Sequence, residues 1–176
     1  FINNQKGKYN IPADKFAYAY IEYKDNITSY KIYQPYSEKY KWINTNNSSV
    51  WELWEQLPEK GDTLIITKSR KDAMCIMENW KIPACSLQAE GYYPKKHVVE
   101  QLKNRFTNVF ILYDNDFDKE ENYGKIFGKR ISELFDLKYL EIPDEYQVKD
   151  CSDFYKKYGK IKFLMLKNII NGRYYR

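Results

Sequence analysis

The stretch that decides the fold is NVFILYDND, residues 108–116, in which a nearly continuous apolar run ends on two aspartates separated by one residue. The run Asn108–Tyr113 is short and rich in β-branched and aromatic residues, which predicts a strand covered on both faces. Similar runs at Thr63–Thr67, Pro83–Leu87 and Lys138–Ile142 predict three more strands. Strands of this kind are typical of a parallel sheet buried between helices.

Helices are predicted between these strands by the spacing of their apolar residues. Arg70–Trp80 places Ala73, Ile76 and Trp80 on one helical face. Further helices are expected at Pro94–Phe106, Asn122–Phe135, Ser152–Tyr158 and Ile161–Ile170. Alternating strands and helices predict an α/β fold with a mostly parallel four-stranded sheet flanked by helices.

Residues 1–57 have a different composition, rich in tyrosine, asparagine and lysine. Strands are predicted at Ala17–Tyr23 and Ser29–Tyr33, joined by a turn at 24–26, with a possible third strand at Lys39–Asn44 and a short helix at Ser48–Leu57. We therefore expect a small β-rich lobe at 1–57, an α/β domain at 58–159 and a C-terminal helix at 160–176. The tyrosines of the lobe can stack on bases while lysines meet phosphates, or can form an ordinary strand face.

The composition fits one ordinary domain with a small extra lobe, since 43% of the 176 residues are hydrophobic. The net charge of +5 is compatible with a polyanionic partner without requiring one. Cys75, Cys85 and Cys151 are too few and too scattered for a disulfide framework or a zinc site. No apolar run approaches the length of a membrane span, so we expect a cytoplasmic protein with no membrane partner. Because the chain starts at Phe1, we also expect it to be a piece of a longer polypeptide.

Acidic residues follow the predicted strands, at the edge of a parallel sheet where sites form. These residues are Asp72 after the first strand, Glu90 after the second, Asp114 and Asp116 after the third, and Asp150 and Asp153 after the fourth. Carboxylates of this kind suit Mg²⁺ or Mn²⁺. Two such ions could activate an attacking hydroxyl and stabilise a leaving pyrophosphate.

Other kinds of site fit the sequence less well. Asp114, Asp116 and Asp118 match the first ligands of a calcium-binding EF-hand loop, but Lys125 stands where that loop needs a glutamate. Asp118 is expected to be a solvated loop acid, as are the two glutamates that follow it. The single histidine, His97, lies in a predicted helix and is expected to be structural or exposed. We find no glycine-rich phosphate-binding loop in the sequence.

Three segments together resemble the TOPRIM domain of DnaG-type primases and phage primase–helicases, over roughly 61–159. They are LIITKSRKDAM (64–74), FILYDNDFDKEENYG (110–124) and VKDCSDFYKKYG (148–159). The segment YKIYQPYSEKYKWIN (30–44) resembles the basic lobe that precedes TOPRIM in phage-type primases. The resemblance implies roles for the following residues: Asp114 and Asp116 as a metal-binding pair, Asp150 and Asp153 as further acids at the metal, Asp72 as the acid of the first helix, and Gly124 as the glycine after the pair.

The sequence departs from this family at the end of the first strand, where TOPRIM domains usually carry Glu-Gly. Here those positions are Lys68 and Ser69. A lysine cannot bind Mg²⁺, but it could bind a triphosphate or the template backbone. Either Glu90 supplies the missing carboxylate or the site is degenerate.

The resemblance implies synthesis of RNA primers on single-stranded DNA from ribonucleoside triphosphates, with a replicative helicase as a candidate partner. Catalysis would rest on Mg²⁺ or Mn²⁺ and on Asp114, Asp116, Asp150 and Glu90. The residues expected to meet nucleotide or template are Lys68, Arg70, Lys71, Lys39, Lys41 and Tyr40. Two alternatives stay open: a TOPRIM nuclease that uses the same acids, and a non-catalytic module that only binds nucleic acid.

Overall fold

A parallel sheet of four strands forms the centre of the protein in the computed structural model, which describes residues 2–4, 7–9, 14–45, 47–88 and 93–172. The strands are β6 (Gly61–Thr67), β7 (Ala84–Ser86), β8 (Phe106–Leu112) and β9 (Lys138–Leu140). Their order is β7-β6-β8-β9, and every neighbouring pair is parallel. The four predicted strands and their parallel arrangement are therefore confirmed.

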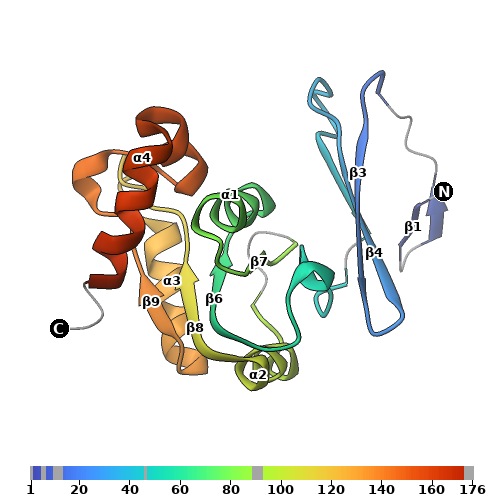
Figure 1. The fold of residues 1–176 in the computed structure, drawn as a ribbon. Helices are drawn as coiled ribbons and strands as arrows, with labels where there is room; N and C mark the ends of the chain where they lie inside the picture. Colours follow the sequence, from blue (N-terminus) through green and yellow to red (C-terminus); the bar gives the residue numbers. More distant parts are fainter. Residues whose placement is uncertain (1, 5–6, 10–13, 46, 89–92, 173–176) are drawn as a thin grey trace.

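Helices cover both faces of this sheet, as Figure 1 shows. They are α1 (Arg70–Trp80), α2 (Lys96–Arg105), α3 (Tyr123–Phe135) and α4 (Cys151–Gly172). One buried cluster joins α1 and α4 to one face of the sheet, and a second joins α2 and α3 to the other. Burial of apolar side chains on both faces is what the uninterrupted apolar strands predict.

The last helical stretch combines two predicted helices. Gly159 has φ 76° and ψ 176°, which is not helical, so α4 changes direction there. The part after this kink packs on α1, because the Phe163 ring stacks on Trp80 with centroids 4.7 Å apart. The Trp80 indole Nε1 also donates a hydrogen bond to the Phe163 carbonyl at 2.9 Å. The C-terminal segment thus contributes to the core of the α/β domain.

A separate antiparallel sheet precedes the α/β domain, which confirms the predicted β-rich lobe. Its strands are β3 (Tyr18–Lys24), β4 (Ile27–Tyr33) and β5 (Trp42–Thr45), in the order β3-β4-β5. The β3–β4 turn uses Asp25 and Asn26, both with positive φ, which suits a tight hairpin. A short pair, β1 (Ile2–Asn4) and β2 (Gly7–Tyr9), was not predicted.

The predicted helix at Ser48–Leu57 is wrong. Only a single 3₁₀ turn, η1 (Trp54–Gln56), forms in this segment, and Leu53 before it has a left-handed φ of 65° that a helix does not allow. The preceding residues are buried in an irregular path, and Glu52 instead pairs with Ser86 at the edge of β7. Tertiary packing therefore overrides the local helical pattern in this segment.

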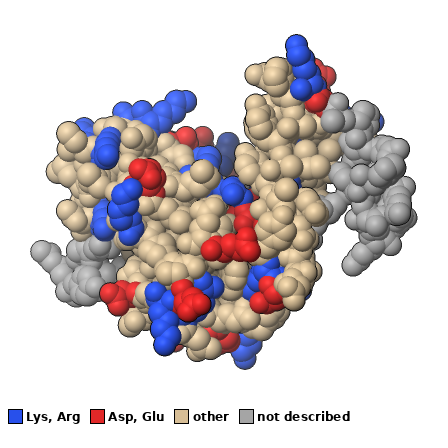
Figure 2. All heavy atoms as spheres, turned by 45° about the vertical axis from the view of Figure 1, so that its right-hand side comes forward, with Lys and Arg blue, Asp and Glu red and all other residues tan. Residues whose placement is uncertain are grey.

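Polar contacts attach one end of the antiparallel sheet to the α/β domain. Buried Glu22 of β3 accepts a hydrogen bond from the Leu53 backbone N–H at 2.9 Å and pairs with Arg70 at the start of α1. Ser29 of β4 donates to the Gln88 side chain at 2.7 Å. Figure 2 shows acidic and basic side chains lying together where the two parts meet. Among the described residues, no helix is both long and apolar enough to cross a membrane.

Candidate metal centre

Three carboxylates meet at the carboxyl edge of the parallel sheet. Asp114 follows β8, Asp72 lies in the first turn of α1 after β6, and Asp150 immediately precedes α4. One oxygen from each lies within 4.8 Å of the others, and all three residues are buried. We call Asp72, Asp114 and Asp150 the carboxylate cluster. Spacing along the sequence placed these acids at one edge, and the structure brings these three together.

Asp72 ties the start of α1 to the start of α4. Its Oδ2 accepts a hydrogen bond from the Ser69 hydroxyl at the N-cap of α1. Its Oδ1 accepts hydrogen bonds from the Ser152 backbone N–H at 2.9 Å and the Ser152 hydroxyl at 2.8 Å. Burial, reinforced by the nearby negative charge of Asp150, raises the pKa of Asp72 to about 6. The sequence placed Asp72 after the first strand and matched it to a family motif, and the structure places it within the cluster.

Asp150 caps α4 and bonds to a lysine. Its Oδ1 accepts a hydrogen bond from the Asp153 backbone N–H at 2.8 Å, a typical N-cap contact. Its Oδ2 lies 2.5 Å from the Lys71 ammonium. Asp153 itself is exposed, and its carboxylate is not among the three that cluster. Its metal-binding role therefore stays a prediction.

Asp116 turns away from the cluster towards α3. Its Oδ2 accepts a hydrogen bond from the Gly124 backbone N–H at 2.9 Å, and its Oδ1 lies 3.2 Å from the Lys149 ammonium. Burial raises the pKa of Asp116, but these two contacts outweigh burial and leave the pKa below its usual value. Gly124 is needed because a Cβ there would lie only 2.2 Å from the Asp114 carbonyl oxygen. The structure thus gives the two aspartates different contacts: Asp114 lies in the cluster and Asp116 contacts the start of α3, and their shared metal-binding role stays a prediction.

Asn115, between the two aspartates, joins the loops that carry the cluster. Its backbone N–H donates to the Lys149 carbonyl at 2.6 Å, which brings the segment before Asp150 beside Asp114. Its side-chain amide donates to the Ile142 carbonyl at 3.1 Å and to Asp144 at 2.7 Å. Sequence reasoning missed this residue, because its role depends on a contact across the chain.

Three lysines surround the carboxylates, and we call Lys68, Lys71 and Lys149 the lysine rim. The Lys68 ammonium lies 3.9 Å from Asp114 Oδ2, and the Lys149 ammonium lies 3.5 Å from the same oxygen. Burial raises the pKa of Asp114, Lys68 opposes that rise, and Asp150 reinforces it. The net effect is a raised pKa, so the lysine rim compensates only part of the cost of burying this carboxylate.

The donor set of the carboxylate cluster fits a small divalent cation. Three buried carboxylates that converge from different loops offer hard oxygen ligands, which Mg²⁺ and Mn²⁺ prefer. The pKa values of Asp72 and Asp114 are raised mainly by burial, so their charged forms are under-stabilised by the chain alone. A bound cation would stabilise those charged forms. Glu90, the other predicted acid, lies outside the described residues.

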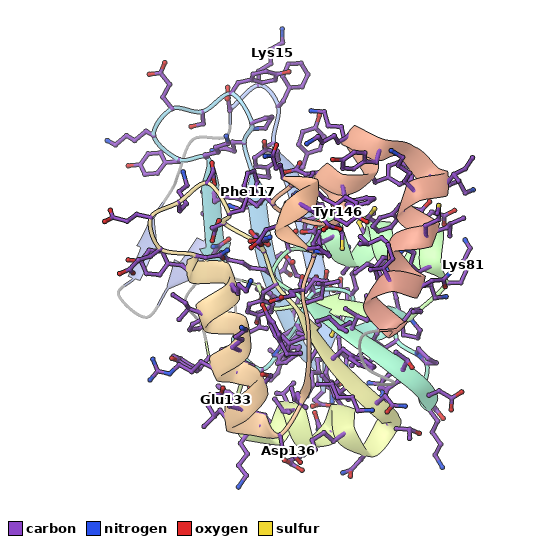
Figure 3. All side chains as sticks on the ribbon, turned by 90° about the vertical axis from the view of Figure 1, so that its left-hand side faces the viewer. Lys15, Lys81, Phe117, Glu133, Asp136 and Tyr146 are labelled. Atoms are coloured by element: carbon purple, nitrogen blue, oxygen red, sulfur yellow. The ribbon has the colours of Figure 1, made fainter. Side chains whose placement is uncertain are left out.

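A hollow of about 590 Å³ opens beside Asp116. Its wall includes Phe117, Lys149, Lys156 and Lys157, from the loop after β8, the loop before α4 and α4 itself. Figure 3 shows Phe117 beyond the end of α3 that is opposite Glu133, so the hollow lies near the N-terminal end of α3, where Gly124 contacts Asp116. The hollow therefore lies beside Asp116 and the rim lysine Lys149, and its wall is mixed in charge, with four lysines, three aspartates and one aromatic ring among the residues that line it.

Aromatic rings line the open part of the antiparallel sheet and end beside Arg70 at the start of α1. We call Tyr20, Tyr33 and Trp42 the stacking platform. The rings of Tyr33 and Trp42 are stacked at 4.4 Å, and Tyr20 lies 6.4 Å from Trp42. The Arg70 guanidinium lies 5.1 Å from the centre of the Tyr20 ring, and the Lys31 ammonium lies 4.8 Å from Trp42. Because Arg70 starts α1 two residues before Asp72, the platform leads towards the carboxylates.

Burial along β3 shows that this face is open at one end. On one face of the strand, Tyr18 is 54% exposed, whereas Glu22 on the same face is 6% exposed. Tyr33 and Trp42 pair across β4 and β5 at the open end. The face is thus closed against the α/β domain near Glu22 and accessible near Trp42, which is 46% exposed.

The predicted nucleic-acid residues fall into two groups. Lys68, Arg70 and Lys71 lie at the start of α1, where Lys68 and Lys71 pair with acids of the carboxylate cluster and Arg70 pairs with Glu22 of β3. Lys39, Tyr40 and Lys41 are exposed and lie in the connection between β4 and β5, next to Trp42 in the sequence. The Lys39 ammonium lies 5.3 Å from the Tyr40 ring. The second group therefore adjoins the stacking platform and not the carboxylates.

Comparison with solved structures shows that the chain has the fold of the DnaG-type primase catalytic core. The resemblance noted in the sequence is thus confirmed for the fold. No family model matches the sequence, and no curated protein matches it.

The individual structures are distant in sequence. The Escherichia coli primase catalytic core is 16% identical with a TM-score of 0.65, covering 94% of this chain and 55% of that one. A DnaG primase catalytic domain bound to single-stranded DNA is 14% identical with a TM-score of 0.63, covering 94% and 56%. A third structure contains primase domains of bacteriophage T7 gp4, bound to an RNA/DNA hybrid and dTTP, in a complex with the T7 lagging-strand DNA polymerase. It is 17% identical with a TM-score of 0.58, and the match covers 85% of this chain and 74% of that one. The chain spans a little over half the length of the two DnaG-type structures.

Proposed function

We propose that this chain is the metal-dependent nucleotidyl-transfer core of a primase that makes RNA primers on single-stranded DNA. The observation that carries the proposal is the carboxylate cluster, which lies at the carboxyl edge of a parallel sheet within a DnaG-type fold. Sites in open parallel sheets form at this edge. Mg²⁺ is the proposed cofactor, with Mn²⁺ as a substitute.

The proposed chemistry assigns separate tasks to the residues at this edge. Asp72, Asp114 and Asp150 would hold the divalent ion, which would supply positive charge to the reacting phosphate when bound. Lys68 and Lys71 stand at the rim of the cluster and would hold the oxygens of the incoming triphosphate. Their contribution is positioning and charge neutralisation, which are the main tasks of a protein in phosphoryl transfer. The hollow beside Asp116 offers room for the incoming nucleotide.

The stacking platform supports a path for the template strand. Bases of a single strand would stack on Trp42 and Tyr33, and Tyr20 with Arg70 would lead the strand towards the carboxylates. Lys39 and Lys41 adjoin this path and would meet the phosphates, with Tyr40 as a further ring for a base. A DnaG catalytic domain of this fold is bound to single-stranded DNA, which supports the same class of ligand here. A replicative helicase as partner and a cytoplasmic location belong to the proposal as well.

A second candidate is a non-catalytic module that binds nucleic acid, and the specific observation in its favour is Lys68. Its ammonium lies 3.9 Å from Asp114 Oδ2, where a positive charge opposes the binding of a metal ion. This alternative retains the stacking platform but predicts no metal-dependent reaction. The nuclease alternative uses the same acids, and water replaces the attacking hydroxyl.

Two assays on the same preparations separate these functions. One measures incorporation of labelled ribonucleotides on a single-stranded DNA template with Mg²⁺ or Mn²⁺, and the other measures cleavage of that DNA. We expect incorporation in the wild type, a loss of about 100-fold or more in Asp114→Asn, and near wild-type incorporation in Glu133→Gln. Glu133 is the control because it is an exposed acid near the C-terminal end of α3, away from Phe117 and the hollow (Figure 3).

The other outcomes identify the alternatives. Cleavage that depends on Asp114, without incorporation, would show a nuclease. DNA binding with neither reaction, and with no change in Asp114→Asn, would show a binding module.

A further inference from the structure

We propose that the site takes a single divalent ion and that the Lys68 ammonium provides the second positive charge beside Asp114, where it binds a phosphate of the nucleotide. This inference deepens the proposed function and rests on its metal site. It concerns how many ions the chain binds and which residue replaces a second one.

The geometry of the carboxylate cluster suits one ion. Mg²⁺ binds oxygens at about 2.1 Å, so ligands on opposite sides of the ion are roughly 4.2 Å apart. One oxygen from each of Asp72, Asp114 and Asp150 lies within 4.8 Å of the others, which is close to the spread of ligands around a single cation. A small adjustment of side chains would close them on that cation.

The carboxylate that a second ion would require is already engaged by the chain. Among the residues that the structure describes, Asp116 is the remaining acid beside Asp114, and its Oδ2 accepts the Gly124 backbone N–H at 2.9 Å. Its Oδ1 lies 3.2 Å from the Lys149 ammonium. A metal ion bridging Asp114 and Asp116 would have to displace both contacts, and Gly124 is fixed by its close approach to the Asp114 backbone.

Positive charge already occupies the side of Asp114 that faces these residues. The Lys68 ammonium is 3.9 Å and the Lys149 ammonium 3.5 Å from Asp114 Oδ2. The Lys68 side chain is 20% exposed and the Lys149 side chain 46% exposed, so Lys68 is the more enclosed of the two. Lys68 is therefore the stronger candidate for a built-in cation.

The balance of charge supports the same count. The carboxylate cluster and Asp116 carry four negative charges, and the lysine rim carries three positive charges. One divalent ion would leave the group with one net positive charge, which suits an incoming polyphosphate. Two ions would leave three net positive charges within a partly buried site, where like charges repel strongly. An ammonium is also a normal point-charge partner for phosphate oxygens.

The test counts bound Mn²⁺ ions by electron paramagnetic resonance of the free ion during titration. The wild type should bind one ion per chain. Lys68→Glu should bind two, because it replaces the ammonium with a carboxylate beside Asp114. Lys68→Gln should bind one ion about tenfold more tightly, because it removes repulsion without adding a ligand. Lys81→Glu is the matched control and should behave as the wild type.

Lys81 suits this purpose because it ends α1, pairs with Glu78 at 3.3 Å and is 71% exposed. Figure 3 shows it on the far side of the molecule from Phe117, the residue that follows Asp116. The substitution changes net charge as Lys68→Glu does, but away from the carboxylates. It therefore controls for general electrostatic effects.

A second measurement examines the phosphate-binding role without any metal. Binding of ATP to the protein in EDTA should weaken at least about fivefold in Lys68→Gln and stay unchanged in Lys81→Glu. Thermal unfolding of each variant identifies any that does not fold, and Lys68→Gln carries the test if Lys68→Glu unfolds.

Two ions in the wild type, no bound ion, or one ion in a folded Lys68→Glu would each overturn the inference. Unchanged ATP binding by Lys68→Gln would overturn its phosphate-binding part. Nucleotide incorporation is measured separately, so one bound ion without incorporation would reject the proposed function and leave this inference standing.

Discussion

Gly124→Ala should damage both the stability of the protein and the geometry of its carboxylates. A Cβ at this position would lie 2.2 Å from the Asp114 carbonyl oxygen and 2.8 Å from the Asp114 carbonyl carbon. Both are backbone atoms at the end of a central strand, so neither can rotate away. The start of α3 must therefore move from β8 by at least about 1.2 Å to reach an ordinary contact distance.

The expected cost follows from this forced movement. Overpacking a well-packed region costs about 1–3 kcal/mol, and alanine regains up to about 1 kcal/mol through its higher helix propensity. We expect a net destabilisation of about 2 kcal/mol, or a lowering of Tm by roughly 4–8 °C. The same movement breaks the 2.9 Å hydrogen bond from the Gly124 N–H to Asp116, so Mn²⁺ affinity should fall about tenfold.

Gly128→Ala is the matched control, one turn along the same helix. A Cβ at Gly128 would meet the Tyr139 ring at 2.9 Å, an atom at the far end of a side chain, and the Tyr113 Cβ at 3.2 Å, which is a milder approach than the 2.2 Å at Gly124. Urea unfolding followed by circular dichroism, with Mn²⁺ titration, compares the two variants. The reasoning is refuted if Gly124→Ala unfolds within about 0.5 kcal/mol of the wild type and binds Mn²⁺ equally well.

Three further predictions concern the platform, a buried acid and the attachment of the lobe. Trp42→Ala should weaken binding of single-stranded DNA roughly 5- to 150-fold in EDTA, since a stacked base contributes about 1–3 kcal/mol; fluorescence anisotropy measures this, and equal binding would remove the platform from the strand path. In metal-free protein, burial raises the pKa of Asp72 to about 6, so the folded protein favours the protonated form of this side chain. The resulting stabilisation is complete below the ordinary pKa of 3.8 and is lost as the pH rises through about 6. Urea unfolding between pH 4 and 7.5 should therefore show a loss of up to about 3 kcal/mol that Asp72→Asn flattens, and an unchanged profile would contradict it. Glu22→Gln should destabilise the protein by about 2 kcal/mol in urea unfolding, because Arg70 loses its buried partner, and wild-type stability would show that this pair does not hold the lobe.

The fold could be predicted from the sequence where a local pattern and the tertiary environment agree. The apolar runs of β6 and β8 are buried on both faces, so their patterns predict both the strands and their central place in the sheet. The helical spacing of the apolar residues in Arg70–Trp80 predicted the same first and last residues that α1 has in the structure. The helix predicted at 48–57 does not form, because the apolar residues of this segment fill the space beside β7. There the backbone of Glu52 pairs with Ser86 and cannot remain helical.

The site could be predicted only in part, because residue spacing gives the edge of the sheet and not the direction of a side chain. Asp114 and Asp150 were expected near each other and lie in the cluster. The rotation of Asp116 towards Gly124 depends on how closely α3 approaches β8, which no pattern in the sequence reveals. The inclusion of Asp72 depends on hydrogen bonds to Ser152, eighty residues away in the chain.

The sequence offered stacking on the tyrosines of the lobe as one possibility, but it did not identify the three rings of the stacking platform, for a related reason. Its rings come from three strands, and they meet only when the register pairs Tyr33 with Trp42. The signal in the sequence was the alternation of Tyr18 and Tyr20 along a predicted strand. Lys39 and Lys41 were predicted to meet nucleic acid because of their charge, whereas the rings of the stacking platform beside them were not named.

The most direct test of the central claim is the anomalous scattering of Mn²⁺ in crystals of this chain soaked with the ion and a ribonucleoside triphosphate. We expect one strong peak within about 2.2 Å of carboxylate oxygens from Asp72, Asp114 and Asp150, with the Lys68 ammonium against a phosphate. A carboxylate cluster without a peak, its oxygens still bonded only to lysines and backbone, would contradict it.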